Sequence, residues 1–379
     1  MTNVLIIFGT RPEAIKLAPV IRALSSDERF KTIVCSTGQH REMLNQVLDI
    51  FKIRLDHDLD LMRNNQDLFD ISTHALKRLK DILAKIKPSL LIVQGDTTTA
   101  FISALAAYYH KIKIAHVEAG LRSFNVFSPY PEEANRRFIS VIADLHFAPT
   151  IDSRKNLISE GVSEKKIFVT GNTVIDALLE IKKSLNNNKI NISIKNEILT
   201  YLPEDFFKKR YVLITMHRRE KFGKEFEIIL KTIKKLAQHH KELNFVYPVH
   251  LNPNVQKPVN KILENQSNIF LIPPQNYLNF IYLMSKCYFL LSDSGGVQEE
   301  CYVFKKPIIV LRDVTERKEA IRAGYAFLAG SEAERIGFHF EDIYKKLNNN
   351  YNFFNAKNPF GDGNASKRIV KVIAKELIH

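Results

Sequence analysis

Residues 2–19 read TNVLIIFGTRPEAIKLAP, and this stretch decides the fold. The branched apolar run at Val4–Phe8 predicts a buried strand, and Gly9 allows a tight turn after it. The spacing of apolar residues over Ile15–Leu24 predicts a helix, and Pro12 suits its first turn. A strand followed directly by a helix is the repeating unit of a parallel sheet with right-handed crossovers.

The same alternation continues along the chain in two series. In the first series we predict further strands at Thr32–Ser36, Leu90–Gln94, Lys113–Val117, Leu145–Phe147 and Ile167–Thr170, and helices at Arg41–Ile50, Phe69–Lys85, Thr98–Tyr109 and Glu132–Ile142. In the second we predict strands at Tyr211–Thr215, Phe245–Pro248, Ile269–Ile272, Phe289–Ser292, Ile308–Leu311 and Tyr325–Leu328, and helices at Glu225–His239, Leu278–Ser285, Gly296–Phe304, Glu332–Leu347 and Ala365–Leu377.

A polar, Asn-rich stretch at Leu185–Lys195, followed by Pro203, separates the two series and predicts an inter-domain region. We therefore expect an α/β fold with two Rossmann-like, doubly wound domains facing across a cleft. Their expected bounds are residues 1–172 and 205–363, with a connecting helix and linker at 173–204.

The composition is that of an ordinary globular protein and excludes several classes. The 379 residues are 45% hydrophobic and 25% charged, unlike collagen-like, disordered or disulfide-scaffold proteins. The longest nearly apolar stretch, Ala100 to Tyr109, is too short to span a bilayer, and the N-terminus lacks the pattern of a signal peptide. The cysteines, at positions 35, 287 and 301, lie far apart, which argues against a structural metal and is typical of a reducing compartment. We therefore expect a cytoplasmic protein with no metal, no cofactor and no membrane contact.

The formal net charge of +14 points to an acidic partner, which is nucleic acid, an anionic membrane or a phosphorylated small molecule. A basic, solvated surface explains the same charge equally well. Because the basic residues are dispersed and no zinc-finger, RRM or basic-zipper signature appears, nucleic acid is the weaker alternative.

Charged residues cluster directly after the predicted strands. Arg11 and Lys16 flank the start of the first helix, a location that favours anions because free N–H groups point at them. The spacing is neither G-x-G-x-x-G nor a P-loop, which makes nicotinamide binding or a Walker-type site a poor interpretation. An ordinary capped turn with two surface cations is the alternative.

Three carboxylates occupy comparable places in the first series. Asp96 follows one strand, Glu118 ends another, and Glu132 opens a helix. Two of them have an ordinary explanation, since Asp96 can be a helix cap and Glu132 can be favoured by the helix dipole. Glu118 is harder to explain, because a buried carboxylate is costly unless it is paired or used. Together they predict an acid/base centre.

The second series supplies cations and glycines at its strand ends. His217 adjoins two arginines after one strand, and His250 follows the next. The sequence Ser294-Gly295-Gly296 opens a helix and would give backbone N–H groups close access to a phosphate. Glu300 lies one turn further on, where it could accept ribose hydroxyls, and Arg317 is a diphosphate candidate. A simple glycine-bearing turn is the alternative.

Ten ordered motifs carry a resemblance to a known family. They read GTRPEAIKLAP, QHREML, GDTTTA, HVEAGLRS, PYPEEANRR, GNTVIDAL, HRRE, YPVHLNPNV, DSGGVQEE and RDVTER. In this order and spacing the chain resembles, over essentially its whole length, the non-hydrolysing UDP-N-acetylglucosamine 2-epimerases of bacteria. The resemblance implies a GT-B-like fold whose C-terminal helix, residues 364–379, joins the first domain. It also implies a homodimer.

The resemblance implies a reaction as well. UDP-N-acetylglucosamine would be converted reversibly to UDP-N-acetylmannosamine by elimination of UDP to a 2-acetamidoglucal and re-addition, for surface polysaccharide synthesis. By resemblance, Asp96, Glu118 and Glu132 are the acid/base carboxylates, and His217 supports the departing phosphate. The residues implied to bind the substrate are Arg11, Lys16, His250, Gln275, Phe280, Ser294, Gly295, Gly296, Glu300 and Arg317.

Some features depart from the family pattern. Gln39, His40 and Glu42 match part of a regulatory substrate site, but Asn65 stands where some relatives have an arginine. Lys305 replaces a glycine that relatives usually carry before Lys-Pro, which alters a helix C-terminus. The alternatives are a hydrolysing epimerase, an epimerase of a modified UDP-sugar, and a non-catalytic nucleotide-sugar sensor.

Overall fold

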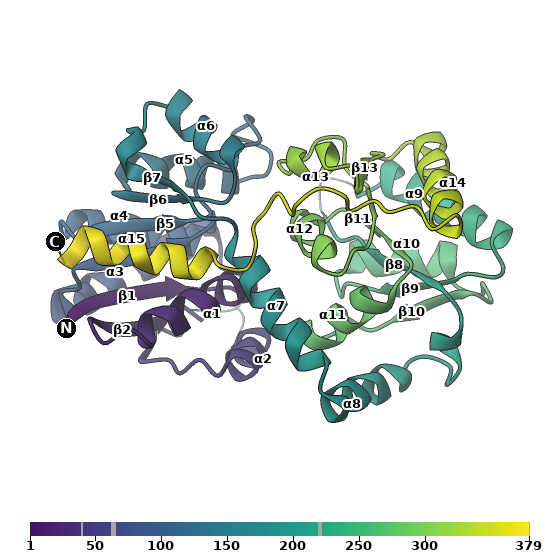
Figure 1. Ribbon diagram of the computed structural model, residues 1–379, viewed down its shortest axis with the longest axis horizontal. Coiled ribbons are helices and arrows are strands. Elements are labelled where there is room, and N and C mark those ends of the chain that lie inside the picture. Colours follow the sequence, from purple (N-terminus) through teal and green to yellow (C-terminus); the bar gives the residue numbers. More distant parts are fainter. Residues whose placement is uncertain (39–40, 62–65, 219–221, 379) are drawn as a thin grey trace. The chain divides into compact units, whose positions relative to one another are not determined.

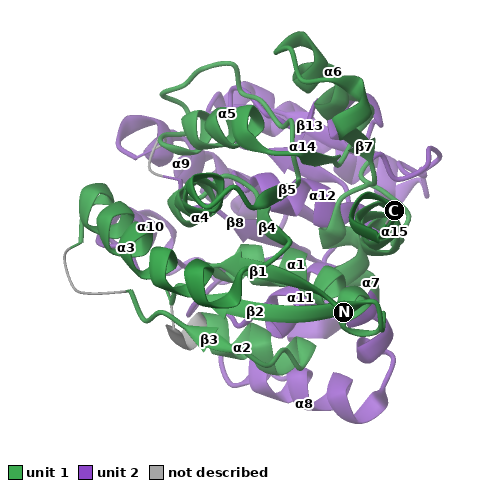
Figure 2. Cartoon of the chain, turned by 90° about the vertical axis from the view of Figure 1, so that its left-hand side faces the viewer, with its two compact units in different colours: residues 1–179, 360–379 green, residues 180–359 purple. Residues whose placement is uncertain are grey.

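A computed structural model describes residues 1–38, 41–61, 66–218 and 222–378 (Figure 1). The chain divides into two compact units (Figure 2). Unit 1 contains residues 1–179 and 360–379, and unit 2 contains residues 180–359. The first crossing between the units falls inside helix α7 (Thr173–Leu185).

Unit 1 is built on a parallel sheet. Its strands are β1 (Thr2–Phe8), β2 (Phe30–Ser36), β3 (His57–Asp58), β4 (Leu90–Gln94), β5 (Lys113–Val117), β6 (Leu145–Ala148) and β7 (Ile167–Val169). They lie in the order β3-β2-β1-β4-β5-β6-β7, with every described pair parallel. The order reverses between β1 and β4, and such a reversal creates a crevice at the carboxyl ends of the two strands.

The helices of unit 1 cover both faces of this sheet, as the alternating pattern predicts. They are α1 (Arg11–Ser25), α2 (Arg41–Phe51), α3 (Leu68–Ile86), α4 (Thr98–Tyr109), α5 (Glu132–Ile142), α6 (Ile151–Ser159), a short 3₁₀ turn (Glu164–Lys166), α7 and the C-terminal α15 (Ala365–Ile378). Helix α4 packs between α3 and α5, whereas α15 packs on α1 (Figures 1 and 2).

A buried carboxylate fixes the C-terminal helix to unit 1. Asp176 of α7 accepts the backbone N–H groups of Ala365 at 3.2 Å and Ser366 at 2.9 Å, and the Ser366 hydroxyl at 2.7 Å. These N–H groups lie in the first turn of α15, where the helix dipole also stabilises a negative charge.

Unit 2 repeats the architecture. Its strands are β8 (Tyr211–Thr215), β9 (Asn244–Pro248), β10 (Ile269–Ile272), β11 (Phe289–Ser292), β12 (Ile308–Val310) and β13 (Ala326–Leu328), in the parallel order β10-β9-β8-β11-β12-β13. Its helices are α8 (Asn188–Leu199), a 3₁₀ turn (Phe206–Lys208), α9 (Lys224–His239), α10 (Pro253–Leu263), α11 (Tyr277–Lys286), α12 (Gly295–Val303), α13 (Lys318–Arg322) and α14 (Ala333–Asn348). The order reverses between β8 and β11.

Most of the polar stretch at residues 185–195, predicted as part of a connecting helix and linker, is helical. Asn187 caps α8, and its side-chain oxygen accepts the N–H groups of Lys189 at 3.0 Å and Ile190 at 3.4 Å. Ile194 and Ile198 are buried at a spacing of four residues, so one apolar face sufficed to fold the segment. The sequence analysis also placed no strand at β3 and no helices at α6, α10 and α13.

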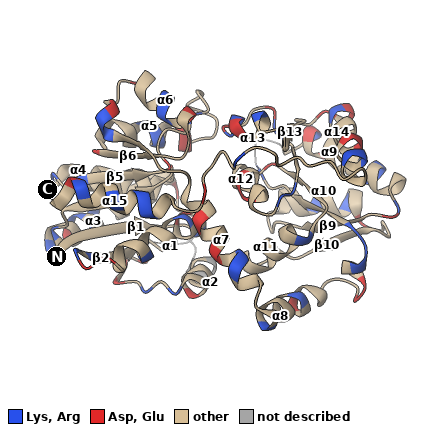
Figure 3. Ribbon diagram, in the orientation of Figure 1, with Lys and Arg blue, Asp and Glu red and all other residues tan. Residues whose placement is uncertain are grey.

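Basic residues are spread over elements of both units (Figure 3). None of the helices in the described part of the chain is long and apolar enough to cross a bilayer.

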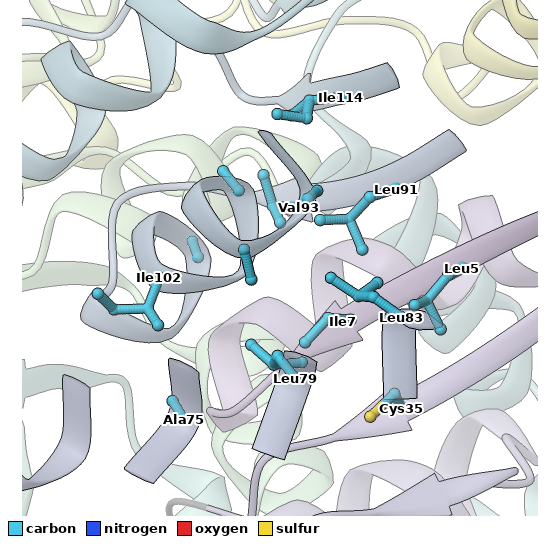
Figure 4. Packing of buried hydrophobic residues seen from close by; sticks show 14 of the residues in the cluster. Leu5, Ile7, Cys35, Ala75, Leu79, Leu83, Leu91, Val93, Ile102 and Ile114 are labelled. Atoms are coloured by element: carbon cyan, nitrogen blue, oxygen red, sulfur yellow. The ribbon is translucent and has the colours of Figure 1, made fainter. Parts of the chain in front are cut away.

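The core of unit 1 lies partly between the sheet and helices α3 to α5 (Figure 4). Leu5 and Ile7 of β1 pack in one buried cluster with Leu79 and Leu83 of α3 and with Ile102 of α4. Alternate residues of a strand point to opposite faces, so the continuous apolar run of β1 serves both layers of helices. A strand buried in this way positions its carboxyl end, where the first candidate residues begin.

Candidate active site

Glu13 connects the turn after β1 to the turn after β4. Its side chain is buried, and Oε2 accepts the N–H groups of Gly9 at 3.0 Å and Thr10 at 2.7 Å. Oε1 accepts the Thr97 hydroxyl at 2.7 Å. Burial raises the pKa of the Glu13 carboxyl, and the four hydrogen-bonding groups around it oppose that rise. The two turns at the topological reversal are therefore held together by one side chain.

Arg11 and Lys16 lie in the first two turns of α1 and are both half-buried. The Lys16 ammonium is 2.5 Å from Oε2 of Glu118, and the Gln94 amide donates to the same oxygen at 2.8 Å. Glu118 has φ +65°, a left-handed conformation that costs a non-glycine residue about 1–3 kcal/mol and is concentrated at functional sites. The buried carboxylate is thus paired, as its position in the sequence required.

Asp96 follows β4 and is bound to the first turn of α5. Arg136 forms an ion pair with the Asp96 carboxylate through Nη2, and its Nε donates to the same oxygen at 3.1 Å. The Asn135 amide donates to the Asp96 carbonyl at 2.9 Å. Buried Glu133 accepts from Nη1 of Arg136 at 2.9 Å and so fixes the guanidinium. Since Glu132 begins the same helix, Asp96 and Glu132 belong to one corner of unit 1.

His116 of β5 contacts the backbone next to Asp96. Its Nε2 lies 2.7 Å from the carbonyl oxygen of Gly95, the residue before Asp96. Burial lowers the pKa of His116 to about 4, so at neutral pH the ring is uncharged and donates its Nε2–H to that carbonyl.

In unit 2, Asp293 at the end of β11 organises the residues after β8. Its Oδ2 accepts the backbone N–H groups of His217 and Arg218, both at 2.9 Å. The His217 ring stacks on His250, with centroids 5.6 Å apart and planes at 17°. Burial, and to a smaller extent the neighbouring His217, lowers the pKa of His250. The His217 side chain is 44% exposed and accessible to a ligand.

Arg317 packs against the first turn of α12. A Cβ on Gly295 would lie 3.0 Å from Nη1 of Arg317, so glycine permits this approach. The guanidinium donates to Glu299 at 2.9 Å and lies 3.5 Å from Glu316. Burial raises the pKa of Glu316, but the charges of Arg317 and Arg312 outweigh it and bring the pKa to about 2. The charge of Arg317 is therefore shared with two carboxylates.

The remaining predicted residues of unit 2 lie at the start of α12, in the loop after β10, and in α11. Ser294 is the N-cap of α12, and Gly296 and Glu300 lie within that helix. Gln275 precedes α11 and donates to the Pro273 carbonyl at 2.8 Å. Phe280, in α11, is half-buried.

Each unit thus gathers its predicted residues at the carboxyl edge of its own sheet. Sequence reasoning missed Glu13, Arg136 and Asp293 as organising residues. A signal existed for each, because they lie inside the motifs TRPE, EEANRR and SDSGG. Their roles depend on contacts with distant turns, which a motif does not reveal.

The predicted regulatory residues lie outside the description. Gln39 and His40 are not among the described residues, and the side chain of Glu42, in α2, is not described either.

The comparisons with known proteins agree over the full length. The family model for UDP-N-acetylglucosamine 2-epimerase matches residues 22–374. UDP-N-acetylglucosamine 2-epimerase of Campylobacter jejuni is 47% identical, with 98% of this chain and 97% of the relative covered. The Neisseria meningitidis relative of the same name is 49% identical, with 98% and 99% covered.

Solved structures give the same result. The crystal structure of the Neisseria meningitidis UDP-GlcNAc 2-epimerase bound to UDP-GlcNAc has a TM-score of 0.93 at 47% identity, covering 99% of this chain and 100% of that one. A Rickettsia africae glycosyltransferase, 16% identical with a TM-score of 0.58, shares the fold alone and covers 100% and 98% of the two chains. The predicted α/β, GT-B-like fold class is confirmed. The chain belongs to the UDP-N-acetylglucosamine 2-epimerase family.

Proposed function

We propose that this protein reversibly converts UDP-N-acetylglucosamine to UDP-N-acetylmannosamine. Family membership supports the reaction class, and the relatives from Neisseria meningitidis and Methanocaldococcus jannaschii bind UDP-GlcNAc in their structures. The observation that carries the proposal for this chain is the set of cation-paired carboxylates at the carboxyl edge of unit 1.

The C2–H bond of the sugar is barely acidic, so the proposed route begins at carbon 1. Loss of UDP from carbon 1 builds positive charge on the ring, which acidifies the neighbouring C–H bond. A carboxylate takes the C2 proton, leaving 2-acetamidoglucal and UDP. UDP then re-adds to carbon 1 while a proton is delivered to the opposite face of carbon 2. The atoms of substrate and product balance without a cofactor.

Asp96 and Glu132 are the proposed proton-transfer groups. The ion pair with Arg136 holds Asp96 in one orientation, and a general base must be held in this way to reach its proton. Glu118 is engaged by Lys16 and Gln94, which favours a role in binding the sugar or assisting. We propose that Lys16 and Arg11 add positive charge near the diphosphate.

Unit 2 is the proposed binding half for UDP. The N–H groups of Gly295 and Gly296 open α12 and suit a phosphate, and Glu300 would accept the ribose hydroxyls. Arg317 adds charge beside the same turn, and His217 with His250 would stabilise the leaving phosphate. Gln275 and Phe280 would hold the uracil. The reaction also requires that the glycal is retained in the active site until UDP returns.

The deciding experiment is incubation of the protein with UDP-N-acetylglucosamine in deuterated water, followed by proton NMR. We expect UDP-N-acetylmannosamine, with deuterium at carbon 2 of both sugar nucleotides. Free UDP and N-acetylmannosamine formed in step with turnover would instead identify a hydrolysing enzyme. Tight binding with no turnover would identify a sensor, and an inert plain substrate would point to a modified UDP-sugar.

The proposal extends to assembly and location. Tyr108, Phe138 and Val141 on α4 and α5 are exposed, and Phe101 and Phe138 lie with centroids 5.1 Å apart. An exposed apolar surface of this kind is suited to a second copy of the chain, giving a homodimer. The three buried cysteines are free thiols, which suits the cytoplasm, where we place a contribution to surface polysaccharide synthesis.

A further inference from the structure

A group of histidines and carboxylates lies in unit 2, where the C-terminus of α9 meets α14. His239 ends α9, His240 is its C-cap, and Glu341 lies on α14. One ligand atom from each of these three residues can be chosen so that all lie within 4.8 Å of one another. Helix α9 runs back from the carboxyl edge of the sheet, so the group lies at the amino ends of the strands, away from His217 and α12.

The ring of His240 lies between two carboxylates. Its Nε2 is 2.8 Å from Oε1 of Glu341, and its Nδ1 is 3.1 Å from Oε1 of Glu242. Each imidazole nitrogen therefore has a carboxylate oxygen beside it, and Nε2 with Oε1 of Glu341 forms a pair of donor atoms that one cation can bridge.

The surroundings of His240 match those of a metal ligand. The residue is 5% exposed, and its ring packs on Phe340 and Tyr344 with centroids 5.1 and 4.7 Å away. Glu242, the hydrogen-bond partner of Nδ1, also accepts a hydrogen bond from the Tyr344 hydroxyl at 2.7 Å. Histidines that bind metals almost always donate their second N–H to a carboxylate or carbonyl, which fixes the tautomer. The carbonyls at the end of α9 also favour a cation there.

We propose that His239, His240 and Glu341 bind a divalent transition-metal ion of the zinc class, with Glu242 orienting His240. Two imidazole nitrogens and one carboxylate oxygen are the donors that zinc accepts, whereas Mg²⁺ and Ca²⁺ prefer oxygen alone. The ion would lie between Nε2 of His240 and Oε1 of Glu341, and water would complete the coordination. The cysteine spacing that argued against a structural metal has no bearing on a site without cysteine.

The ion would brace the end of α9 against α14. The Glu341 side chain is 51% exposed, so the ion can enter from solvent. Because only the folded unit brings the three ligands together, binding stabilises the folded state. The inference does not depend on the proposed epimerase activity.

The test is calorimetric titration of the chelator-treated full chain with Zn²⁺ at about pH 7.5. We expect one Zn²⁺ site that is weakened tenfold or more by Glu341→Gln, His239→Ala and Glu242→Gln. Glu334→Gln, on an exposed position of α14, and His110→Ala, exposed in unit 1, are the matched controls and should bind as the parent does.

Melting temperature gives a second measurement. Zn²⁺ should raise it in the parent and in both controls, and raise it less in the Glu341→Gln variant. Unchanged affinity in all three ligand and orienting variants would overturn the proposal. So would a parent that binds no Zn²⁺ at ~100 µM.

Discussion

The side chain of Asp96 illustrates how one residue depends on a hierarchy of contacts. Its carboxylate is bound by Arg136, and Arg136 is fixed in turn by Glu133. The Thr97 hydroxyl next to it is bound by Glu13 from another turn. A side chain held from several sides loses little conformational entropy when it reaches its reactive orientation. Acid/base catalysis requires a side chain positioned in this way.

Asp96→Asn should lower kcat by roughly 100-fold or more, because the amide cannot accept the proton, while the shape of the site is kept. Steady-state kinetics with UDP-N-acetylglucosamine measures this. Asp81→Asn, on an exposed part of α3, is the control and should leave turnover unchanged. Near-normal turnover of the Asp96 variant would remove this residue from the mechanism.

Two buried histidines give unit 1 a dependence on pH. His116 and His146 are opposite each other on β5 and β6, and both are buried. Burial lowers the pKa of His116 to about 4, and burial together with the neighbouring His116 ring lowers the pKa of His146 to about 3. Both stay neutral in the folded chain but protonate near pH ~6.5 once unfolded. Their contribution to stability is therefore complete above about pH 6.5 and is lost as the pH falls toward the folded pKa values.

His146→Leu removes one of these proton-binding sites. Between about pH 7.5 and pH 5 the parent should lose roughly 2 kcal/mol more unfolding free energy than the variant. Urea denaturation at the two pH values measures the difference. His110→Leu, at an exposed position, should follow the parent at both pH values. Equal losses in the parent and the His146 variant would show that the fold does not lower the pKa of His146.

At the scale of elements, the end of α12 shows a local conflict. Lys305 has φ +54°, and the helix ends in a Schellman arrangement. Its N–H donates to the Tyr302 carbonyl at 3.0 Å, and the N–H of Lys306 donates to the Cys301 carbonyl at 3.0 Å. The position needs a left-handed residue, and the sequence departs here from the glycine that the family resemblance implies. The backbone keeps its geometry, and the lysine bears the conformational cost.

Lys305→Gly should raise the unfolding free energy by about 1 kcal/mol, because glycine adopts this conformation without the Cβ penalty. Thermal unfolding followed by circular dichroism measures the gain. Lys306→Gly is the matched control, since its φ is not positive, and it should give no gain. A Lys305 variant no more stable than the parent would mean that the unfolded-state entropy of glycine cancels the relief.

At the scale of the whole molecule, helices α4 and α5 expose neighbouring apolar side chains that no other part of the described chain covers. Phe138 is 52% exposed and Val141 is 83% exposed, next to partly buried Phe101. Neighbouring apolar side chains of this kind are usually covered in solution.

Phe138→Glu combined with Val141→Glu should convert the proposed dimer to a monomer, because the charges cannot be desolvated in an apolar contact. Light scattering during gel filtration gives the mass. Phe338→Glu, at an exposed position on α14, should leave the mass unchanged. A parent that is already monomeric would exclude this surface as a dimer contact.

The sequence by itself determined most of the strands and helices and where the candidate site residues lie along the chain. The predicted strand at Leu90–Gln94 and helix at Thr98–Tyr109 match β4 and α4 at every residue. Strong periodicity and glycine-bearing turns are local signals, so a single sequence contains them. The local signal is weaker at α8, where the polar composition leaves only a short apolar face with two buried isoleucines four residues apart.

Only the tertiary structure decided which side chains hold the candidate residues in place. The contact of Lys16 with Glu118 spans 102 positions, and that of Arg136 with Asp96 spans 40. No local pattern encodes such pairs, because they exist only when parallel strands bring their carboxyl ends to one edge. The residue types were set by the sequence, and their pairing was set by the order of the strands in the sheet.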